Sequence, residues 1–270
     1  MSISRQAFQQ FRAFLKARSG IDLSDNKQYL VNNRLQPLVL EAGVDDLSDL
    51  LSLINAMPND DLAVKAVDAM TTNETFWFRD ASHFQYLEST VFAELVRMNS
   101  SIRVWSAACS SGQESYSISL SYTKFAEMSG ASSGIKITAT DLSNTVLSRA
   151  REGVYAALEL SRGLPNDLKM EHFSGLRDGW RISQLHRSRV TFSQLNLLDD
   201  FSKLGQFDIV FCRNVLLYFS ASTKLDILRR MTKNMKLGAY LFLSSSEILP
   251  PEMKSLQTIR VAGCKCYRKV

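Results

Sequence analysis

The stretch "IRVWSAACSSGQESYSI" (residues 102–118) joins an apolar run, a turn of small residues and a helical segment. Residues 102–105 are typical of a buried strand, and residues 106–112 are all small. Glu114 then stands in the first turn of the helical segment. Small residues let a ligand approach the backbone, and a helix N-terminus offers it free N–H groups. The stretch therefore predicts an α/β protein with a nucleotide-like cofactor at this turn.

Similar apolar or β-branched runs recur after about residue 100 and alternate with helical segments. The further strand-like runs are residues 135–141, 190–196, 207–213 and 239–247, and helical segments lie at 115–128, 144–152 and 222–235. Alternation of this kind predicts a doubly wound, largely parallel α/β sheet over residues 101–270. The tail, residues 256–270, predicts a closing antiparallel hairpin that turns at Gly263.

One connection between strands is unusually long. Residues 155–190 exceed what a helix between two parallel strands requires. Within them, "HFSGLRDGWRISQL" (172–185) combines two short alternating runs with a turn signal at Asp178–Gly179. We therefore expect a small antiparallel β-subdomain inserted at about residues 170–193.

Residues 1–70 show a different pattern of apolar residues. Apolar residues recur there at helical spacing, as at Phe8, Phe11 and Leu15, which predicts an N-terminal all-helical domain. Pro37 lies inside the second helical pattern. Proline removes a backbone donor, so a kink or an early end is expected there.

Composition limits the class of protein. The chain of 270 residues is 45% hydrophobic, enough for a sizeable core in one large or two small domains. It shows neither a signal peptide nor a membrane-spanning run, which predicts a cytoplasmic protein without membrane insertion. The net charge of +5 would suit an acidic partner: a nucleic acid, a membrane surface or an acidic protein. The four cysteines and three histidines lack ligand spacing, so we expect buried, reduced thiols and no metal.

Polar residues stand where the predicted parallel strands end. Asp141 ends the second strand, Asn196–Leu197 the third and Arg213–Asn214 the fourth. The carboxyl ends of such strands meet at one edge of a sheet, where ligands bind. These residues are therefore expected to surround the cofactor.

The turn after the first strand narrows the choice of cofactor. It has one glycine, Gly112, rather than the G-x-G-x-x-G of dinucleotide sites, and the carboxylate of Glu114 would repel a pyrophosphate. S-adenosylmethionine has no phosphate and carries an amine and a sulfonium, which favour a nearby acid. Asp141 would suit its ribose hydroxyls and Asn196 its adenine edge. Two structural alternatives stay open: Asp141 as only a helix cap and Gly112 as only a turn residue.

Several motifs together resemble one family. They are "MTTNETFWFRD" (70–80), "RVWSAACSSGQESYSI" (103–118), "ATDLSNTVLSRAREGVY" (139–155), "NLLD" (196–199) and "FDIVFCRNVLLYF" (207–219). In this order they are similar to the chemotaxis receptor glutamate methyltransferases, the CheR family. The resemblance implies an N-terminal helical domain, a linker and helix at residues 71–100 that contribute to the cofactor site, and a Rossmann-like methyltransferase domain with a β-subdomain.

The resemblance also implies site residues. The positions that would line the S-adenosylmethionine site are Asn73, Thr75, Arg79, Glu114, Asp141, Asn196, Leu197, Asn214 and Val215, beside Gly112 of the turn. Arg79 would hold either the incoming carboxylate or the methionine end of the cofactor. Tyr218 would hydrogen-bond near the reacting oxygen, with a place in the core as the alternative.

The implied reaction transfers a methyl group to glutamate carboxylates of chemoreceptor cytoplasmic helices and leaves S-adenosylhomocysteine. A glutamate is already ionised at neutral pH, so no general base is expected. Two alternatives remain. One is a cofactor-binding sensor or scaffold without activity. The other is a nucleic-acid methyltransferase, which usually carries an Asn/Asp-Pro-Pro-aromatic motif where this chain has "RNVLLY" (213–218), so no nucleic acid is expected.

Two features concern the receptor. In the family the second N-terminal helix is often basic, and here Lys27 and Arg34 remain to steer and bind the substrate. Some receptors carry a C-terminal tether peptide that adds a strand to the β-subdomain. The turn "SGLRDGW" (174–180) is shorter than in tether-binding members. We therefore expect recognition of the methylation helices without a required tether.

Overall fold

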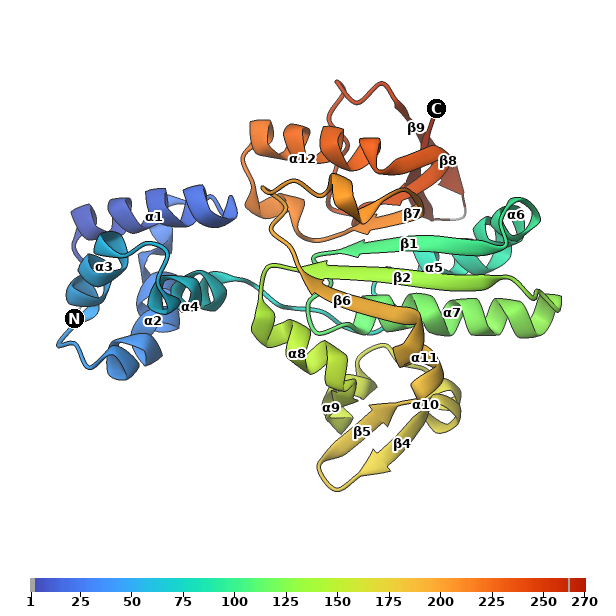
Figure 1. Cartoon of the computed structure of the whole chain (residues 1–270), viewed down its shortest axis with the longest axis horizontal. Helices are drawn as coiled ribbons and strands as arrows, with labels where there is room; N and C mark the ends of the chain where they lie inside the picture. The colour runs from blue at the N-terminus through green and yellow to red at the C-terminus, as the bar shows by residue number, and fades with distance from the viewer. Residues whose placement is uncertain (1–2, 262) are drawn as a thin grey trace.

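The computed structural model describes residues 3–261 and 263–270 as a helical domain joined by a linker to an α/β domain (Figure 1). The helical domain consists of α1 (Arg5–Ser19), η1 (Asp25–Lys27), α2 (Gln28–Ala42), α3 (Leu47–Ala56) and α4 (Asp61–Met70). Their apolar faces form a separate core. The carboxyl ends of the central strands point toward this domain (Figure 1).

Local signals explain the first two helices. Ser4 caps α1 by accepting a hydrogen bond from the Ala7 N–H, and Gly20 ends the helix in the left-handed conformation.

The expected early end of α2 at Pro37 is wrong, because the helix continues to Ala42 before Gly43. Its buried apolar face, which includes Leu38, packs in the helical core on both sides of the proline. This packing offsets the backbone hydrogen bond that proline cannot make.

The α/β domain contains a seven-stranded sheet in the order β6-β2-β1-β7-β8-β10-β9. Its strands are β1 (Ser101–Ala107), β2 (Gly134–Asp141), β6 (Val190–Gln194), β7 (Phe207–Cys212), β8 (Met235–Phe242), β9 (Leu256–Val261) and β10 (Cys264–Lys269). The first five are parallel, and β9 and β10 form the expected antiparallel hairpin. Strand order reverses between β1 and β7, the place where doubly wound sheets bind ligands.

Helices cover both faces of the sheet. The helices of this domain outside the small sheet are α5 (Ala81–Tyr86), η2 (Leu87–Val91), α6 (Phe92–Met98), α7 (Gln113–Ser129), α8 (Asn144–Glu152) and α12 (Ala221–Lys233), with the short turns η3 (Ser202–Leu204) and η4 (Leu216–Tyr218). Along β1, Val104 joins the core on one face and Trp105 the core on the other, as alternation in a buried strand requires. All four cysteines are buried and unpaired. Among the described helices, none is long and apolar enough to cross a membrane.

The small sheet differs in detail from the expected subdomain. It has the order β3-β5-β4, with β3 (Val154–Tyr155), β4 (Phe173–Leu176) and β5 (Gly179–Ile182), and it is accompanied by α9 (Ala157–Ser161), α10 (Asn166–His172) and α11 (Gln184–Arg189). It therefore begins before residue 170. Residues 190–193, placed in it by the sequence, belong to β6, which pairs with β2 of the large sheet. The turn falls at Arg177–Asp178, because Gly179 already pairs with Leu176.

Candidate active site

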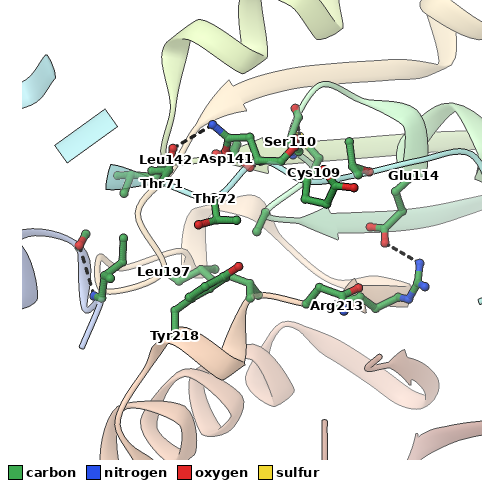
Figure 2. A pocket seen from close by; sticks show the side chains of 18 of the residues that line it. Thr71, Thr72, Cys109, Ser110, Glu114, Asp141, Leu142, Leu197, Arg213 and Tyr218 are labelled. Carbon is green, nitrogen blue, oxygen red and sulfur yellow. Dashed lines mark hydrogen bonds and ion pairs between the residues drawn. The ribbon is translucent and has the colours of Figure 1, made fainter. Parts of the chain in front are cut away.

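A pocket opens at the carboxyl ends of β1, β2 and β7, with the linker and the helical domain as its other walls (Figure 2). The space inside it, including the part open to solvent, is about 970 Å³. Of the predicted cofactor and catalytic residues, these line the pocket: Asn73, Thr75, Arg79, Glu114, Asp141, Asn196, Leu197, Asn214, Val215 and Tyr218.

Gly112 has a different role from the one expected. It is not among the residues that line the pocket. Its φ of +93° lies in the left-handed region, and a Cβ there would come 3.0 Å from the Cβ of Ala150 and 3.2 Å from Cζ of Phe192. Gly112 therefore allows the turn before α7 and its close packing on α8 and β6.

Asp141 forms the floor of the pocket at the end of β2. The residue is 7% exposed, and its carboxylate accepts hydrogen bonds from the backbone N–H groups of Ser110 (2.8 Å) and Ser143 (3.0 Å). Burial raises the pKa of Asp141, and these N–H groups offset part of the rise. The N-cap of α8 is Ser143, which accepts from the Val146 N–H, so Asp141 is not simply the helix cap. Its oxygens keep lone pairs for ligand hydroxyls.

Replacing Asp141 with alanine should weaken S-adenosylhomocysteine binding by about 1–3 kcal/mol, because hydrogen-bonding groups of the buried ligand would lose their acceptor. Calorimetric titration measures the change. Alanine at Asp167, an exposed residue on α10, is the matched control and should leave the affinity unchanged. Equal affinities for the Asp141 variant and the wild type would refute the assignment of this carboxylate to the ligand.

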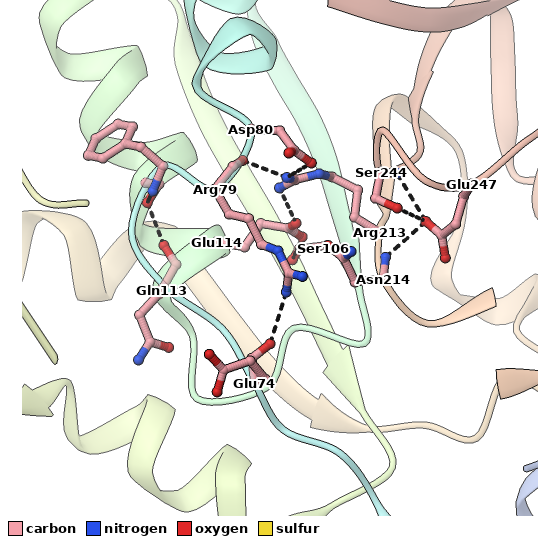
Figure 3. Close-up of polar contacts among 12 residues, drawn as sticks. Glu74, Arg79, Asp80, Ser106, Gln113, Glu114, Arg213, Asn214, Ser244 and Glu247 are labelled. Atoms are coloured by element: carbon pink, nitrogen blue, oxygen red, sulfur yellow. Dashed lines mark hydrogen bonds and ion pairs between the residues drawn. The ribbon is translucent and has the colours of Figure 1, made fainter. Parts of the chain in front are cut away.

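A buried ion-pair network forms the end wall (Figure 3). Arg213, whose side chain is 1% exposed, pairs with Glu114 at 3.0 Å and with Asp80 at 2.7 Å, and it also donates to the Arg79 carbonyl. Ser106 donates to the second oxygen of Glu114 at 2.7 Å. Burial raises the pKa of Glu114, and the charge of Arg213 offsets only part of this. Burial also acts to raise the pKa of Asp80, but the hydrogen bond and charge of Arg213, together with smaller effects of His83 and Ser245, bring this pKa below the usual value.

The linker supplies another wall. The Asn73 amide donates to the Thr71 hydroxyl at 2.9 Å, and the Asn73 carbonyl accepts from the Ser110 hydroxyl at 2.9 Å. The guanidinium of Arg79 lies over the Phe76 ring, 5.3 Å from its centroid, and donates to the Glu74 carbonyl. The ion pairs among the described residues do not include Arg79. Its charge at the pocket is thus available to an anionic group.

The opposite wall comes from the segments after β6 and β7. The Asn196 amide is partly used, because it donates to the Arg18 carbonyl at 2.6 Å and accepts from the Leu198 N–H at 3.0 Å. These bonds join the helical domain to the α/β domain. They use one N–H and one lone pair of the amide, so one of each remains for a contact with an adenine edge. Tyr218 extends into the pocket across from Thr72 (Figure 2), and its hydroxyl has no hydrogen-bond partner among the described residues.

Lys27 and Arg34 lie outside the pocket. Lys27 is next to the exposed Tyr29, with its ammonium 5.7 Å from the ring centroid. Arg34 turns toward the linker and donates to the carbonyls of Met70 and Thr71, both at 2.7 Å, and to the Thr72 hydroxyl at 3.0 Å. Arg34 therefore fixes the linker to α2.

Three parts of the site were not predicted from the sequence. They are the ion pairs of Arg213, the carboxylate of Glu247 behind the pocket wall, and the contribution of Ser19 and Ile21 from the helical domain. An arginine inside the apolar run 207–219 was the only sequence signal for the first of these. A charge in such a run needs a buried partner.

The site fits S-adenosylmethionine. A buried carboxylate at the end of β2 suits a ribose, the wall of Glu114 tolerates an amine or sulfonium but would disfavour a pyrophosphate, and Arg79 can meet a carboxylate. Together with the doubly wound sheet, these residues define a Rossmann-like methyltransferase that uses S-adenosylmethionine.

Comparison with known proteins gives the family. Residues 6–71 match the all-alpha domain of CheR methyltransferases, and residues 73–263 match their SAM binding domain. The chain is 47% identical over 254 residues to chemotaxis protein methyltransferase Cher2 of Pseudomonas putida, covering 92% of each protein. It is 45% identical over 273 residues to chemotaxis protein methyltransferase 1 of Pseudomonas aeruginosa, covering 99% of each. The chain belongs to the CheR methyltransferase family and is an S-adenosylmethionine-dependent methyltransferase of chemotaxis.

Proposed function

We propose that this enzyme methylates glutamate side chains on the cytoplasmic helices of chemoreceptors and acts in the cytoplasm. The observation that carries the proposal is the Arg79 guanidinium at the cofactor pocket, which forms no ion pair with any described residue and can receive a carboxylate. The chemotaxis methyltransferases among its relatives support chemoreceptors as the substrate class. A receptor fragment with its methylation glutamates changed to alanine should accept no methyl groups from the enzyme.

The residues around the pocket have distinct proposed roles. Asp141 would bind the ribose hydroxyls, Leu197 would cover the adenine face, and Glu114 would lie near the amine of the methionine part. Asn73, Thr75, Asn214 and Val215 would complete the walls. The bound S-adenosylmethionine supplies a methyl group on a positively charged sulfur, ready for attack by a nucleophile.

The protein's task is to place the carboxylate and exclude water. Arg79 would hold the incoming carboxylate, or the carboxylate of the cofactor, through its guanidinium donors. Tyr218, whose hydroxyl is free of protein partners among the described residues, would donate a hydrogen bond beside the reacting oxygen. Both would orient the acceptor carboxylate for in-line attack on the methyl group.

The rate of methyl transfer should be independent of pH between about pH 6 and 9, because the glutamate is already ionised with a pKa near 4.3. No histidine is found among the described residues that line the pocket. Burial lowers the pKa of His83 to about 4 and that of His186 to about 3, so neither titrates in this range. Initial rates at saturating cofactor give the profile. A loss of activity with an apparent pKa between 6 and 7 would indicate a general base and contradict the mechanism.

Receptor docking is proposed to involve the outer face of the helical domain. Lys27 can steer an acidic helix, whereas Arg34 contributes charge while its donors are bound to the linker. The exposed residues of α2 itself are Tyr29, Asn33, Gln36, Pro37, Leu40 and Glu41. Only Glu41 among them is charged, and it pairs with Lys65. Such modest steering would fade above physiological salt, where the Debye length is already about 8 Å.

Methylation should not depend on a C-terminal receptor tether. The turn that joins β4 and β5 has only Arg177 and Asp178 between the paired residues Leu176 and Gly179, which leaves little surface to clamp a peptide. Methylation rates of a receptor with and without its tail should therefore agree within about twofold, and an isolated tail peptide should not bind at micromolar concentration. Micromolar binding of the peptide, or activity that disappears with the tail, would overturn this prediction.

A further inference from the structure

A second buried carboxylate lies directly behind the pocket wall. Glu247 follows β8 and is 5% exposed. Its carboxylate accepts hydrogen bonds from the backbone N–H groups of Asn214 (2.9 Å), Leu216 (2.9 Å) and Ser244 (3.0 Å), and from the Ser244 hydroxyl (2.8 Å), as Figure 3 shows in part. Four donors converge on one side chain, so this carboxylate is built into the fold.

The bound N–H groups belong to the loop that forms the pocket wall. Those of Asn214 and Leu216 flank Val215, and both Asn214 and Val215 line the pocket. Asn214 has a φ of +58°, in the left-handed region, which asparagine adopts more readily than most residues but which still benefits from support. The two oxygens of Glu247 bind the loop on either side of Val215 and supply that support.

The same loop continues into the residue proposed to meet the substrate. The Tyr218 N–H donates to the Val215 carbonyl at 3.2 Å and closes the short helix η4. The Tyr218 carbonyl in turn accepts from the Asp22 N–H of the helical domain at 2.8 Å. The loop that lines the pocket is therefore hydrogen-bonded both to Glu247 and to the helical domain.

We propose that Glu247 is a positioning residue for methyl transfer. Through the N–H groups of Asn214 and Leu216 it fixes the shape of residues 213–218. It thereby fixes the position of Val215 relative to the cofactor and the position of Tyr218 at the pocket. The inference rests on the proposed role of this loop in binding the cofactor, and it adds a residue that does not itself line the pocket.

The decisive variant is Glu247→Gln. Glutamine has the same size, but one of its two head atoms is an N–H donor, and both carboxylate oxygens of Glu247 face backbone N–H groups. In either orientation, the NH₂ group of glutamine therefore faces a backbone N–H of the loop or of Ser244, and two donors cannot form a hydrogen bond. Glu247→Asp keeps the charge with a side chain one methylene shorter. Glu252→Gln, at an exposed site on the following segment, is the matched control.

Calorimetric titration with S-adenosylhomocysteine and a turnover assay test the proposal. Glu247→Gln should bind roughly tenfold more weakly at unchanged stoichiometry and lose roughly tenfold in kcat, while Glu247→Asp is intermediate and Glu252→Gln equals the wild type. Lower stoichiometry with unchanged Kd in the folded fraction would show a merely structural role. Wild-type affinity and kcat would also overturn the proposal. If Glu247→Gln does not fold, the Asp variant decides by the same criteria.

The titration needs no methyl acceptor, so it separates this inference from the proposed substrate. If the wild type binds S-adenosylhomocysteine but does not methylate a receptor fragment, the substrate is wrong and the Kd comparison at Glu247 still stands. If the wild type methylates receptors and Glu247→Gln matches it in Kd and kcat, only the role of Glu247 is refuted.

Discussion

Replacing Arg213 with methionine should lower the free energy of unfolding by about 3–5 kcal/mol at neutral pH, the usual cost of removing one partner from a buried ion pair. The side chains of Arg213 and Glu114 are 1% and 12% exposed, so the carboxylate left behind would be poorly hydrated. Asp80 would lose the same partner. Urea unfolding of wild type and variant without ligand measures the difference.

The control is how the destabilisation by the Arg213 variant changes with pH and with replacement of Glu114. Burial already raises the pKa of Glu114 in the folded protein, and loss of Arg213 would raise it further. A group with a raised folded pKa stabilises the fold below its unfolded pKa and loses this contribution as pH rises through the folded value. The defect should therefore shrink on acidification, and it should be smaller in a Glu114→Gln background. A defect that is equal in both backgrounds and at both pH 7 and about pH 5 would contradict the ion-pair account.

Alanine at Arg79 should reduce turnover by about 10²- to 10³-fold, the range seen when a preorganised charge-binding donor is removed. Its guanidinium packs on the Phe76 ring and binds one backbone carbonyl, but no ion pair among the described residues depends on it. The melting temperature should therefore stay within about 2 °C of the wild type. Single-turnover rates with a receptor fragment, beside thermal unfolding, measure both quantities.

Arg162 provides a matched control for Arg79. Like Arg79, it lies near the Phe76 ring, 5.4 Å from the centroid, and it also contacts Glu74, through an ion pair. It is not among the pocket-lining residues. Alanine at Arg162 should keep nearly full turnover. If both variants lose activity equally, or if Arg79→Ala unfolds while its folded fraction stays active, Arg79 is a structural residue.

The fold was largely predictable because its signals are local. Buried strands and amphipathic helices follow one another along residues 101–270, and the hairpin of β9 and β10 was expected at its observed place. The wrong predictions concern elements that depend on tertiary contacts. The two residues of β3 become a strand only by pairing with β5, and α2 passes Pro37 because the packing of its apolar face outweighs one missing hydrogen bond.

The site was predictable to the extent that sheet topology brings strand ends together. Glu114, Asp141 and Asn214 follow three different strands and meet at one pocket, as expected. Hydrogen bonds between residues far apart in the sequence could not be predicted in the same way. Nothing in the neighbouring sequence indicates that Arg34 binds carbonyls 36 and 37 residues away, or that Glu247 binds a loop about 30 residues earlier. Such contacts depend on the tertiary structure.

The most direct measurement is transfer of a radiolabelled methyl group from S-adenosylmethionine to a purified receptor cytoplasmic fragment, followed by treatment with alkali. Esters of carboxylates release methanol under these conditions, whereas methylated nitrogen does not. We expect label on the fragment that is recovered as volatile methanol and is absent when the methylation glutamates are changed to alanine. Binding of S-adenosylhomocysteine without any transfer of label, or label that resists alkali, would contradict glutamate methylation by this enzyme.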